Sequence, residues 1–185
     1  MSNVVRSVAG SNGDGEPQRP AERSRLPFDP IEEAARQWSV RWAETPRMRA
    51  VTSLMRVHQL VLTELDELLR PLGLTFARYE VLVLLSFSRR GALPLGKIGE
   101  RLQVHATSVT PLVKRLENAD LIRRSPHPED GRAVLAAITP QGRAVMEQAT
   151  EAIVSAQFAL SALSEDACDQ LTELLTAPRE AAGDF

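Results

Sequence analysis

Basic and short hydrogen-bonding side chains gather between residues 105 and 132 of this 185-residue chain. Side chains of these types bind phosphate groups and the edges of bases in the major groove of DNA. The set comprises His105, Thr107, Ser108, Thr110, Lys114, Arg115, Arg124, Asp130 and Arg132. Their types and spacing favour a nucleic-acid interface, provided that the chain fold presents them on one surface.

The net charge of −2 hides an uneven distribution of charge along the chain. Residues 70–145 contain 12 Lys and Arg against 6 Asp and Glu. Residues 1–69 contain 9 against 10, and residues 146–185 contain 1 against 8. A basic central segment suits a polyanion-binding protein, although solvated faces of other proteins carry similar blocks of charge.

Several kinds of chemistry lack the residues they need. One cysteine and three histidines are too few for an ordinary zinc site or an internal disulfide. The sequence contains no glycine-rich phosphate loop, nucleophile elbow or metal motif, so we expect neither an enzyme nor a bound cofactor. It also contains no run of 18 apolar residues and no long apolar N-terminal stretch. We therefore expect a cytoplasmic protein with no membrane segment.

The basic segment is predicted to fold as helices followed by two strands. The predicted helices span about 76–87, about 97–102, and from the end of a turn over 103–106 to about Ala119. A short extended piece, Ala92–Leu95, lies between the first two. Residues 121–125 and 133–138 have the pattern of strands, and Asp130-Gly131 between them is a strong hairpin signal.

The two ends of the chain are predicted to form long helices with broad apolar faces. One runs from about Pro46 to Arg70, and another follows Thr139-Pro140 to about Leu163, before a last helix capped by Ser164. Asp29 and Thr75 are the predicted N-caps of two further helices. Helices that are apolar around much of their circumference are buried on several sides, so we expect these ends to form a homodimer interface.

A tight pair of helices followed by a charged hairpin indicates a winged helix–turn–helix. The predicted fold class is therefore mainly α with a small β-hairpin wing (α+β), with N- and C-terminal dimerisation helices. The second helix of the pair can lie in the major groove of DNA, where one of Lys114 and Arg115 would point to the groove. The hairpin brings Arg132 within reach of a phosphate or the minor groove, and Asp130 can hold its guanidinium.

Two stretches of this sequence resemble the MarR (multiple-antibiotic-resistance regulator) family of bacterial transcription factors: GKIGERLQVHATSVTPLVKRLENADLIRR and PEDGRAVLAAITPQGR. The Asp-x-Arg motif of the family's wing falls on Asp130 and Arg132, and its junction of strand, Thr and long helix falls on residues 138–140. The resemblance covers about residues 46–176. It implies an obligate homodimer, palindromic DNA, and often a small-molecule effector bound between the dimerisation and DNA-binding parts.

The sequence departs from the family pattern near the start of the second helix. His105 stands where a small capping residue is usual, and Ala106 is a weak anchor. Pro111 lies inside the expected helix, where proline removes one hydrogen bond. Either the helix kinks there, or it begins with Thr110 as cap and Pro111 at its first position, which would leave residues 105–108 in a loop.

Trp38, His58 and Arg78 are the candidates for an effector site. His58 lies in the apolar stripe of the first long helix, where a core histidine with a satisfied hydrogen bond is the alternative. Trp38 and Trp42 are four residues apart and either anchor a leading helix or cover a pocket. Arg78 would offer its charge to a small aromatic or carboxylate compound.

Four parts of the chain are expected: a disordered arm over 1–28, a short leading helix over 29–45, dimerisation helices over 46–72 and 139–178, and a winged helix–turn–helix DNA-binding domain over 73–138. The leading hypothesis is a sequence-specific transcriptional regulator, a repressor. It would bind a palindromic operator in double-stranded DNA as a homodimer and be released by a small-molecule effector. The alternative is a winged-helix module for protein contacts without specific DNA binding.

Overall fold

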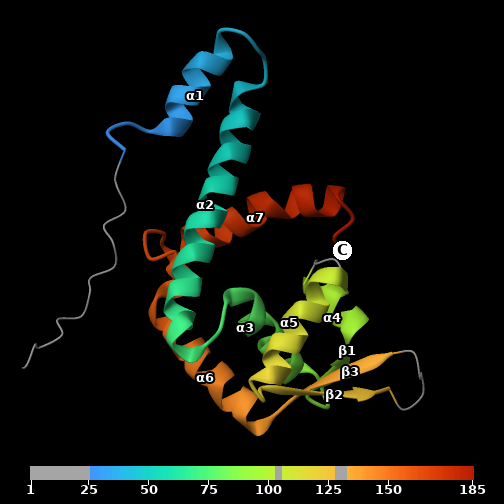
Figure 1. The fold of residues 1–185 in the computed structure, drawn as a ribbon. Coiled ribbons are helices and arrows are strands. Elements are labelled where there is room, and N and C mark those ends of the chain that lie inside the picture. Colours follow the sequence, from blue (N-terminus) through green and yellow to red (C-terminus); the bar gives the residue numbers. More distant parts are fainter. Residues whose placement is uncertain (1–25, 103–105, 128–132) are drawn as a thin grey trace, which may run out of the picture. The chain divides into compact units, whose positions relative to one another are not determined.

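The structure, a computed structural model, describes residues 26–102, 106–127 and 133–185 (Figure 1). All but the last three residues of the arm expected over 1–28 lie outside the described residues. The chain divides into two compact units, residues 1–51 and residues 52–185. Within the described ranges, no helix is both long enough and apolar enough to cross a membrane.

The first unit contains α1 (Pro30–Ser39) and the start of α2 (Thr45–Leu69). Asp29 is the N-cap of α1, as predicted, because its Oδ1 accepts a hydrogen bond from the Ile31 amide at 2.8 Å. Proline at the first helical position loses no hydrogen bond, since that amide has no partner inside a helix.

The two tryptophans do not share one helix, because α1 ends at Ser39, before Trp42. Their rings nevertheless pack, with centroids 4.8 Å apart, and Trp38 Nε1 donates to the Ala43 carbonyl oxygen at 2.8 Å. Trp38 therefore closes the turn between α1 and α2 within the first unit, which agrees with its interpretation as an anchor.

The second unit contains most of α2 and all of the following elements, in chain order: η1 (Arg70–Leu72), α3 (Phe76–Phe87), β1 (Ala92–Pro94), α4 (Leu95–Leu102), α5 (Ala106–Asn118), β2 (Ile122–Pro126), β3 (Val134–Ile138), α6 (Pro140–Ser155), η2 (Gln157–Ala159) and α7 (Glu165–Ala181). The predicted fold class, mainly helical with a small β-hairpin wing, is confirmed.

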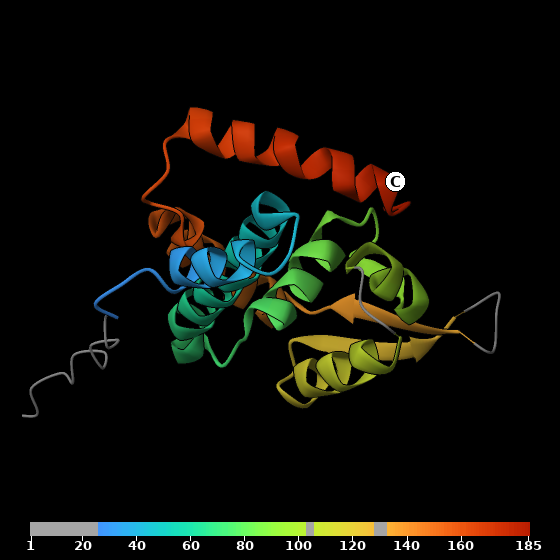
Figure 2. The same cartoon turned by 90° about the horizontal axis from the view of Figure 1, so that it is seen from above.

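The hairpin strands belong to a three-stranded antiparallel sheet of order β1-β3-β2. The short extended piece after α3 is its third strand, because Leu93 of β1 pairs with Ala136 of β3. In Figure 2, α5 lies along β2 and α4 lies nearer to β3. The sheet thus fixes both helices of the helix–turn–helix to one platform.

The core of the second unit forms around α3, which packs against α5, α6 and β3. Val81, Leu82 and Leu85 of α3 are completely buried, and Val113 of α5 meets them in the same core. Burying a large aliphatic side chain stabilises a fold by roughly 1.5–3 kcal/mol, so these contacts hold α3 and α5 together in one core.

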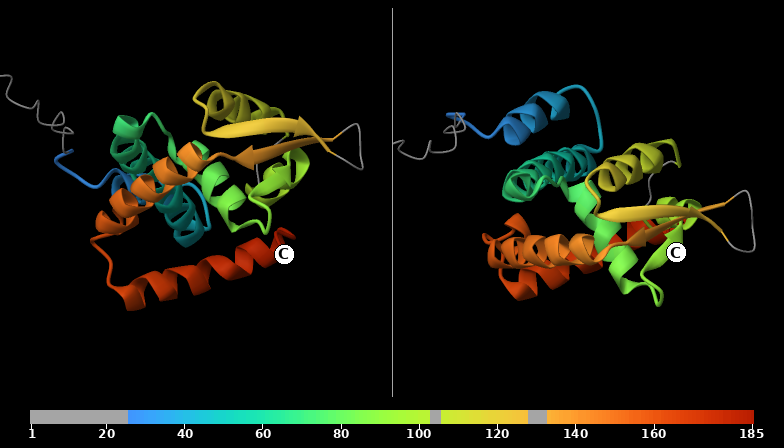
Figure 3. Two further views of the ribbon diagram at one scale, coloured as in Figure 1. Left: turned by 90° about the horizontal axis from the view of Figure 1, so that it is seen from below. Right: turned by 60° about the horizontal axis from the view of Figure 1, so that its bottom comes forward.

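Strand β3 leads directly into α6, as Figure 3 shows. Thr139 is the N-cap of α6, as predicted, because its Oγ1 accepts a hydrogen bond from the Gly142 amide at 2.9 Å. The same hydroxyl donates to the Asp120 carbonyl oxygen at 2.7 Å. The junction between the sheet and α6 is therefore tied to the end of α5.

The prediction of one continuous helix to Leu163 is wrong, because α6 ends at Ser155. The next residues include Gln157, Phe158 and Ala159, with φ angles of 50°, 53° and 59°. These angles are left-handed and cannot continue a right-handed helix. The apolar residues beyond Ser155 are spaced at the helical period although the chain does not continue as a helix there. Ser164 does cap α7, because its Oγ accepts from the Ala167 amide at 3.3 Å.

The predicted cap of α3 is also wrong in its chemistry. Thr75 has the extended backbone of an N-cap residue, but its side chain accepts no hydrogen bond from a backbone amide of the helix. The Phe76 amide instead donates to Oδ1 of Asp66, a residue of α2, at 2.7 Å. A cap supplied by another helix leaves no local pattern in the sequence.

Candidate nucleic-acid interface

Helix α5 has one buried face and one free face. Its residues Val109, Val113 and Leu116 are at most 1% exposed and belong to the core. The exposed residues of α5 are Ser108, Thr110, Pro111, Lys114, Arg115 and Asn118. The free face therefore combines hydroxyl groups near the start of the helix with two positive charges about one turn later.

The helix begins at Ala106, so the alternative in which it starts at Pro111 is wrong. Pro111 lies inside α5 and is exposed. The amide that it lacks would have bonded to the carbonyl oxygen of Thr107. Pro111 is the sixth residue of α5, beyond the first four residues whose amides have no partner inside a helix, so this hydrogen bond is missing from the helix.

Four predicted contact residues fall on that free face, and the others are placed differently. Ser108, Thr110, Lys114 and Arg115 lie together on the surface of α5. His105, Asp130 and Arg132 lie outside the described residues. The backbone of Thr107 belongs to α5, but its side chain also lies outside the described part.

Arg124 lies on β2 and is paired with a carboxylate of α5. Its Nε donates a hydrogen bond to Glu117 Oε2 at 2.6 Å. This hydrogen bond lowers the pKa of the Glu117 carboxyl and raises the pKa of the Arg124 guanidinium. The pair is partly exposed, so Arg124 connects α5 to the sheet at the edge of the candidate interface.

Arg78 belongs to the first turn of α3 and folds back over the preceding turn. Its guanidinium donates to the Gly73 carbonyl oxygen at 2.8 Å and to Thr75 Oγ1 at 3.2 Å. Burial lowers the pKa of Arg78, and the charge of Arg115 lowers it further, while Asp66 acts in the opposite direction. Arg115 and Arg78 therefore contribute to one positive field at the junction of α5 and α3.

The three candidate effector residues belong to different elements of the chain. Arg78 lines a hollow of about 270 Å³ with Asp66, Arg70 and residues 73–75. His58 lies on α2 and is exposed, so its interpretation as a buried core residue is wrong for this chain. Trp38 belongs to the first unit, where it packs on Trp42.

Asp66 is a functional candidate that the sequence did not reveal. It lies near the end of α2, in a run of acidic and leucine residues typical of an ordinary amphipathic helix.

Among the described residues, no group of three or more His, Cys, Asp and Glu side chains could hold a metal ion.

A helix–turn–helix held on a small sheet, with a free basic face on its second helix, defines a winged helix–turn–helix protein. The MarR family profile matches residues 74–134. The HTH-type transcriptional repressor MdtR of Bacillus subtilis is 30% identical over 132 residues, which are 70% of this chain and 83% of that protein. The organic hydroperoxide resistance transcriptional regulator of the same organism is 36% identical over 84 residues, 45% of this chain and 56% of the relative.

The solved structure of Sco5413, a MarR family transcriptional regulator from Streptomyces coelicolor, is similar to this chain with a TM-score of 0.72 and 49% identity. The similarity covers 76% of this chain and 97% of that one. The chain belongs to the MarR family of transcriptional regulators. It is a DNA-binding regulator and not an enzyme, because its relatives are regulators of transcription.

Proposed function

We propose that this chain is a homodimeric repressor that binds a palindromic operator and releases it when a small effector binds. The free face of α5 carries the proposal, because Lys114 and Arg115 stand exposed on a helix whose opposite face is locked into the core. In a two-fold dimer, the two copies of α5 would enter major grooves about one helical turn apart, roughly 34 Å.

The wing would add a second contact to each half-site. Arg132 and Asp130 occupy the Asp-x-Arg positions of the family's wing in the sequence, and β2 and β3 flank the segment that contains them. Arg124 is a further contact, at the edge of the same sheet. Phosphate contacts of this kind position the protein on DNA, while the α5 side chains read bases.

Exposed apolar side chains on the outer helices support the proposal of a homodimer. The large ones on α2 within the second unit are Leu54, Met55, Val57 and Leu60, and those that follow in the chain include Val154, Phe158, Leu163 and Leu174. Large apolar side chains that stay exposed in such numbers suit an association site. A second copy would cover it.

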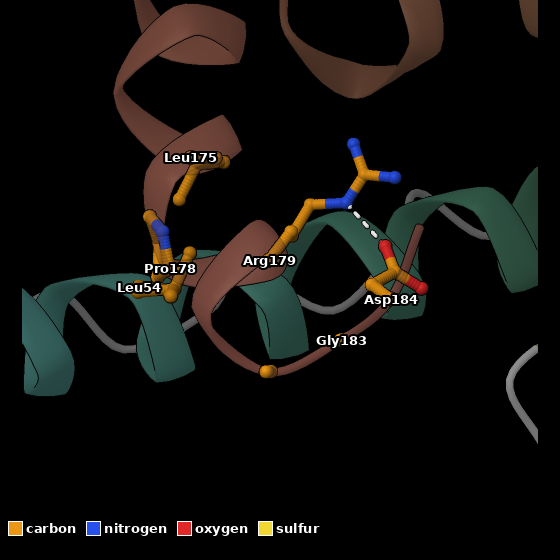
Figure 4. Close-up of a pocket in the computed structure, with 7 residues that line it drawn as sticks. Leu54, Leu175, Pro178, Arg179, Gly183 and Asp184 are labelled. Carbon is orange, nitrogen blue, oxygen red and sulfur yellow. Dashed lines mark hydrogen bonds and ion pairs between the residues drawn. The ribbon is translucent and has the colours of Figure 1, made fainter.

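Figure 4 shows part of this surface, where Leu54 of α2 lies beside Pro178 and Leu175 of α7. These residues line a hollow of about 480 Å³, together with Arg179 and Asp184, which are joined by a hydrogen bond of 2.6 Å. The apolar wall supports the same conclusion, because a partner helix can fill a hollow that this chain leaves open.

A small aromatic or carboxylate compound is the proposed effector. The hollow beside Arg78 lies where α2 joins α3, which is where the dimerisation part meets the DNA-binding part. The guanidinium of Arg78 would attract an anion, and His58 stands exposed on α2 for a second contact. Such a compound can shift the protein between conformations only by its difference in affinity for them.

Capture of genomic fragments by the purified full chain, followed by sequencing, tests the proposal. We expect enrichment of fragments that share an inverted repeat, and a solution mass about twice the 20.3 kDa of the chain. Random recovery of fragments in the presence of competitor DNA would contradict sequence-specific binding. A monomeric mass at micromolar concentration would contradict the palindromic operator.

A further inference from the structure

The turn between α2 and α3 is fastened by side chains from both of its sides. From α2, the Asp66 carboxylate accepts the hydrogen bond of the Phe76 amide at 2.7 Å. From α3, the Arg78 guanidinium donates to the Gly73 carbonyl oxygen at 2.8 Å. Gly73 itself has a φ of 68°, a left-handed angle that glycine adopts without strain.

A cap from another helix does more than an ordinary N-cap. When the residue before a helix supplies the cap, the hydrogen bond satisfies one amide and fixes only the start of that helix. Here the acceptor belongs to α2, so the same hydrogen bond also holds the start of α3 against the end of α2. Loss of the acceptor would leave the Phe76 amide without this hydrogen bond. It would also remove a constraint on the angle between α2 and α3.

The orientation of α3 determines the position of α5. The two helices share a core in which Leu82 and Leu85 of α3 and Val113 of α5 are completely buried. In a close-packed core, a movement of one helix displaces the helix packed against it, because there is no empty space for the side chains to move into. A rotation of α3 about the turn at residues 70–75 would therefore carry α5 with it.

We infer that Asp66 is a positioning residue for DNA recognition, whose hydrogen bond to the Phe76 amide sets the orientation of the DNA-binding part relative to α2. The inference rests on the proposed function, because orientation matters most when two copies of α5 must reach two half-sites at a fixed separation. Asp66 acts through the turn and needs no contact with DNA.

The experiment measures binding to the captured operator and to versions whose half-sites are moved apart or together by one or two base pairs. Wild-type protein should show a sharp optimum at the natural spacing. Asp66→Ala should bind the natural operator about tenfold more weakly than wild type does. Its affinity should also fall less than the wild-type affinity does when the half-sites are moved, so that its affinity depends less on spacing. Asp66→Asn keeps an oxygen acceptor of the same length and should retain the wild-type profile.

Two controls separate positioning from charge and from stability. Glu64→Ala removes the same charge from an exposed position two residues away on α2 and should leave affinity and spacing profile unchanged. Ile153→Val trims a buried side chain of α6 and should lower stability while leaving the hydrogen bond between Asp66 and the Phe76 amide in place. Asp66→Glu lengthens the side chain and keeps its charge, so it should fold and still weaken binding at the natural spacing.

Each remaining result has a definite meaning. If Asp66→Ala and Asp66→Glu lower the melting temperature but keep the wild-type affinity and spacing profile, Asp66 is only a helix cap and the inference is overturned. The same conclusion follows if Ile153→Val flattens the profile as much as Asp66→Ala does. If wild-type protein binds all spacings equally, the proposal of two half-sites fails instead.

Discussion

The α-carbon of Gly142, in the first turn of α6, lies directly against the carbonyl oxygen of Leu121. A Cβ atom at position 142 would stand 2.0 Å from that oxygen and 3.1 Å from Cγ1 of Ile138. The carbonyl is backbone and cannot move aside as a flexible side chain would, and the Thr139 amide already donates a hydrogen bond to it at 3.0 Å. This contact joins the start of α6 to the segment between α5 and β2.

Gly142→Ala should therefore destabilise the fold although alanine favours helices. Overpacking against backbone costs about 1–3 kcal/mol, which corresponds to a fall in melting temperature of roughly 2–10 °C for a chain of this size. Thermal unfolding followed by circular dichroism measures the change. Gly96→Ala is the matched control, because a Cβ there meets nothing within 4 Å. Equal melting temperatures for the two variants would contradict the close contact at Gly142.

Glu80 on α3 gives a prediction for the pH dependence of stability. Burial raises the pKa of its carboxyl above the ordinary value of 4.5. Folding therefore disfavours the charged form of Glu80, and burying the carboxylate lowers the stability of the fold at pH values above its folded pKa. This free-energy cost disappears as the pH falls below 4.5, because the carboxyl is then protonated in both the folded and the unfolded chain. Glu80→Gln should be more stable than wild type by less than about 1 kcal/mol at about pH 7, since part of the side chain still contacts water.

Thermal unfolding of wild type and Glu80→Gln across a pH series checks this prediction. The difference in melting temperature should be roughly 1–3 °C near neutral pH and should vanish at about pH 4. Glu64→Gln makes the same chemical change at an exposed position of α2 and provides the comparison. A wild-type protein more stable than Glu80→Gln at neutral pH would show that the carboxylate has a favourable partner.

The ion pair between Arg124 and Glu117 allows a test of whether Arg124 contacts DNA. Arg124→Ala should weaken operator binding by about fivefold and make it less dependent on salt, as expected for a lost phosphate contact. Glu117→Gln releases Arg124 and removes a negative charge near DNA, so its affinity should equal or exceed that of wild type. Fluorescence anisotropy at several salt concentrations measures both effects. Equal losses in the two variants would indicate that Arg124 only braces α5 against β2.

Much of this architecture could be predicted because local patterns specify it. The helix predicted over about residues 76–87 corresponds to α3, and the caps at Asp29, Thr139 and Ser164 have local sequence signals. The free face of α5 followed from the same spacing, since Val109 and Val113 had to face the core. Membership of the MarR family agrees with the resemblance over about residues 46–176, and the family profile matches residues 74–134 within that range.

The features that could not be predicted depend on distant contacts or on backbone angles. The cap of α3 comes from Asp66, ten residues before Phe76 and on another helix. The end of α6 is set by left-handed angles at non-glycine residues, whose types carry no such signal. His58 matched an apolar stripe and yet is exposed, because the stripe is buried only at its end, at Leu65 and Leu69, while Leu54 and Met55 are exposed like His58.

The central claim, that the free face of α5 binds the operator, is tested most directly by the affinities of Lys114→Ala and Arg115→Ala for the captured operator. Arg56→Ala removes the same charge from an exposed position on α2 and serves as the control, with solution mass confirming its assembly. At least one α5 variant should bind the operator about 5–100-fold more weakly, and the slope of its log affinity against log salt concentration should fall by about one, while Arg56→Ala should bind as wild type does. Wild-type affinity in both α5 variants would show that the free face of α5 does not bind the operator.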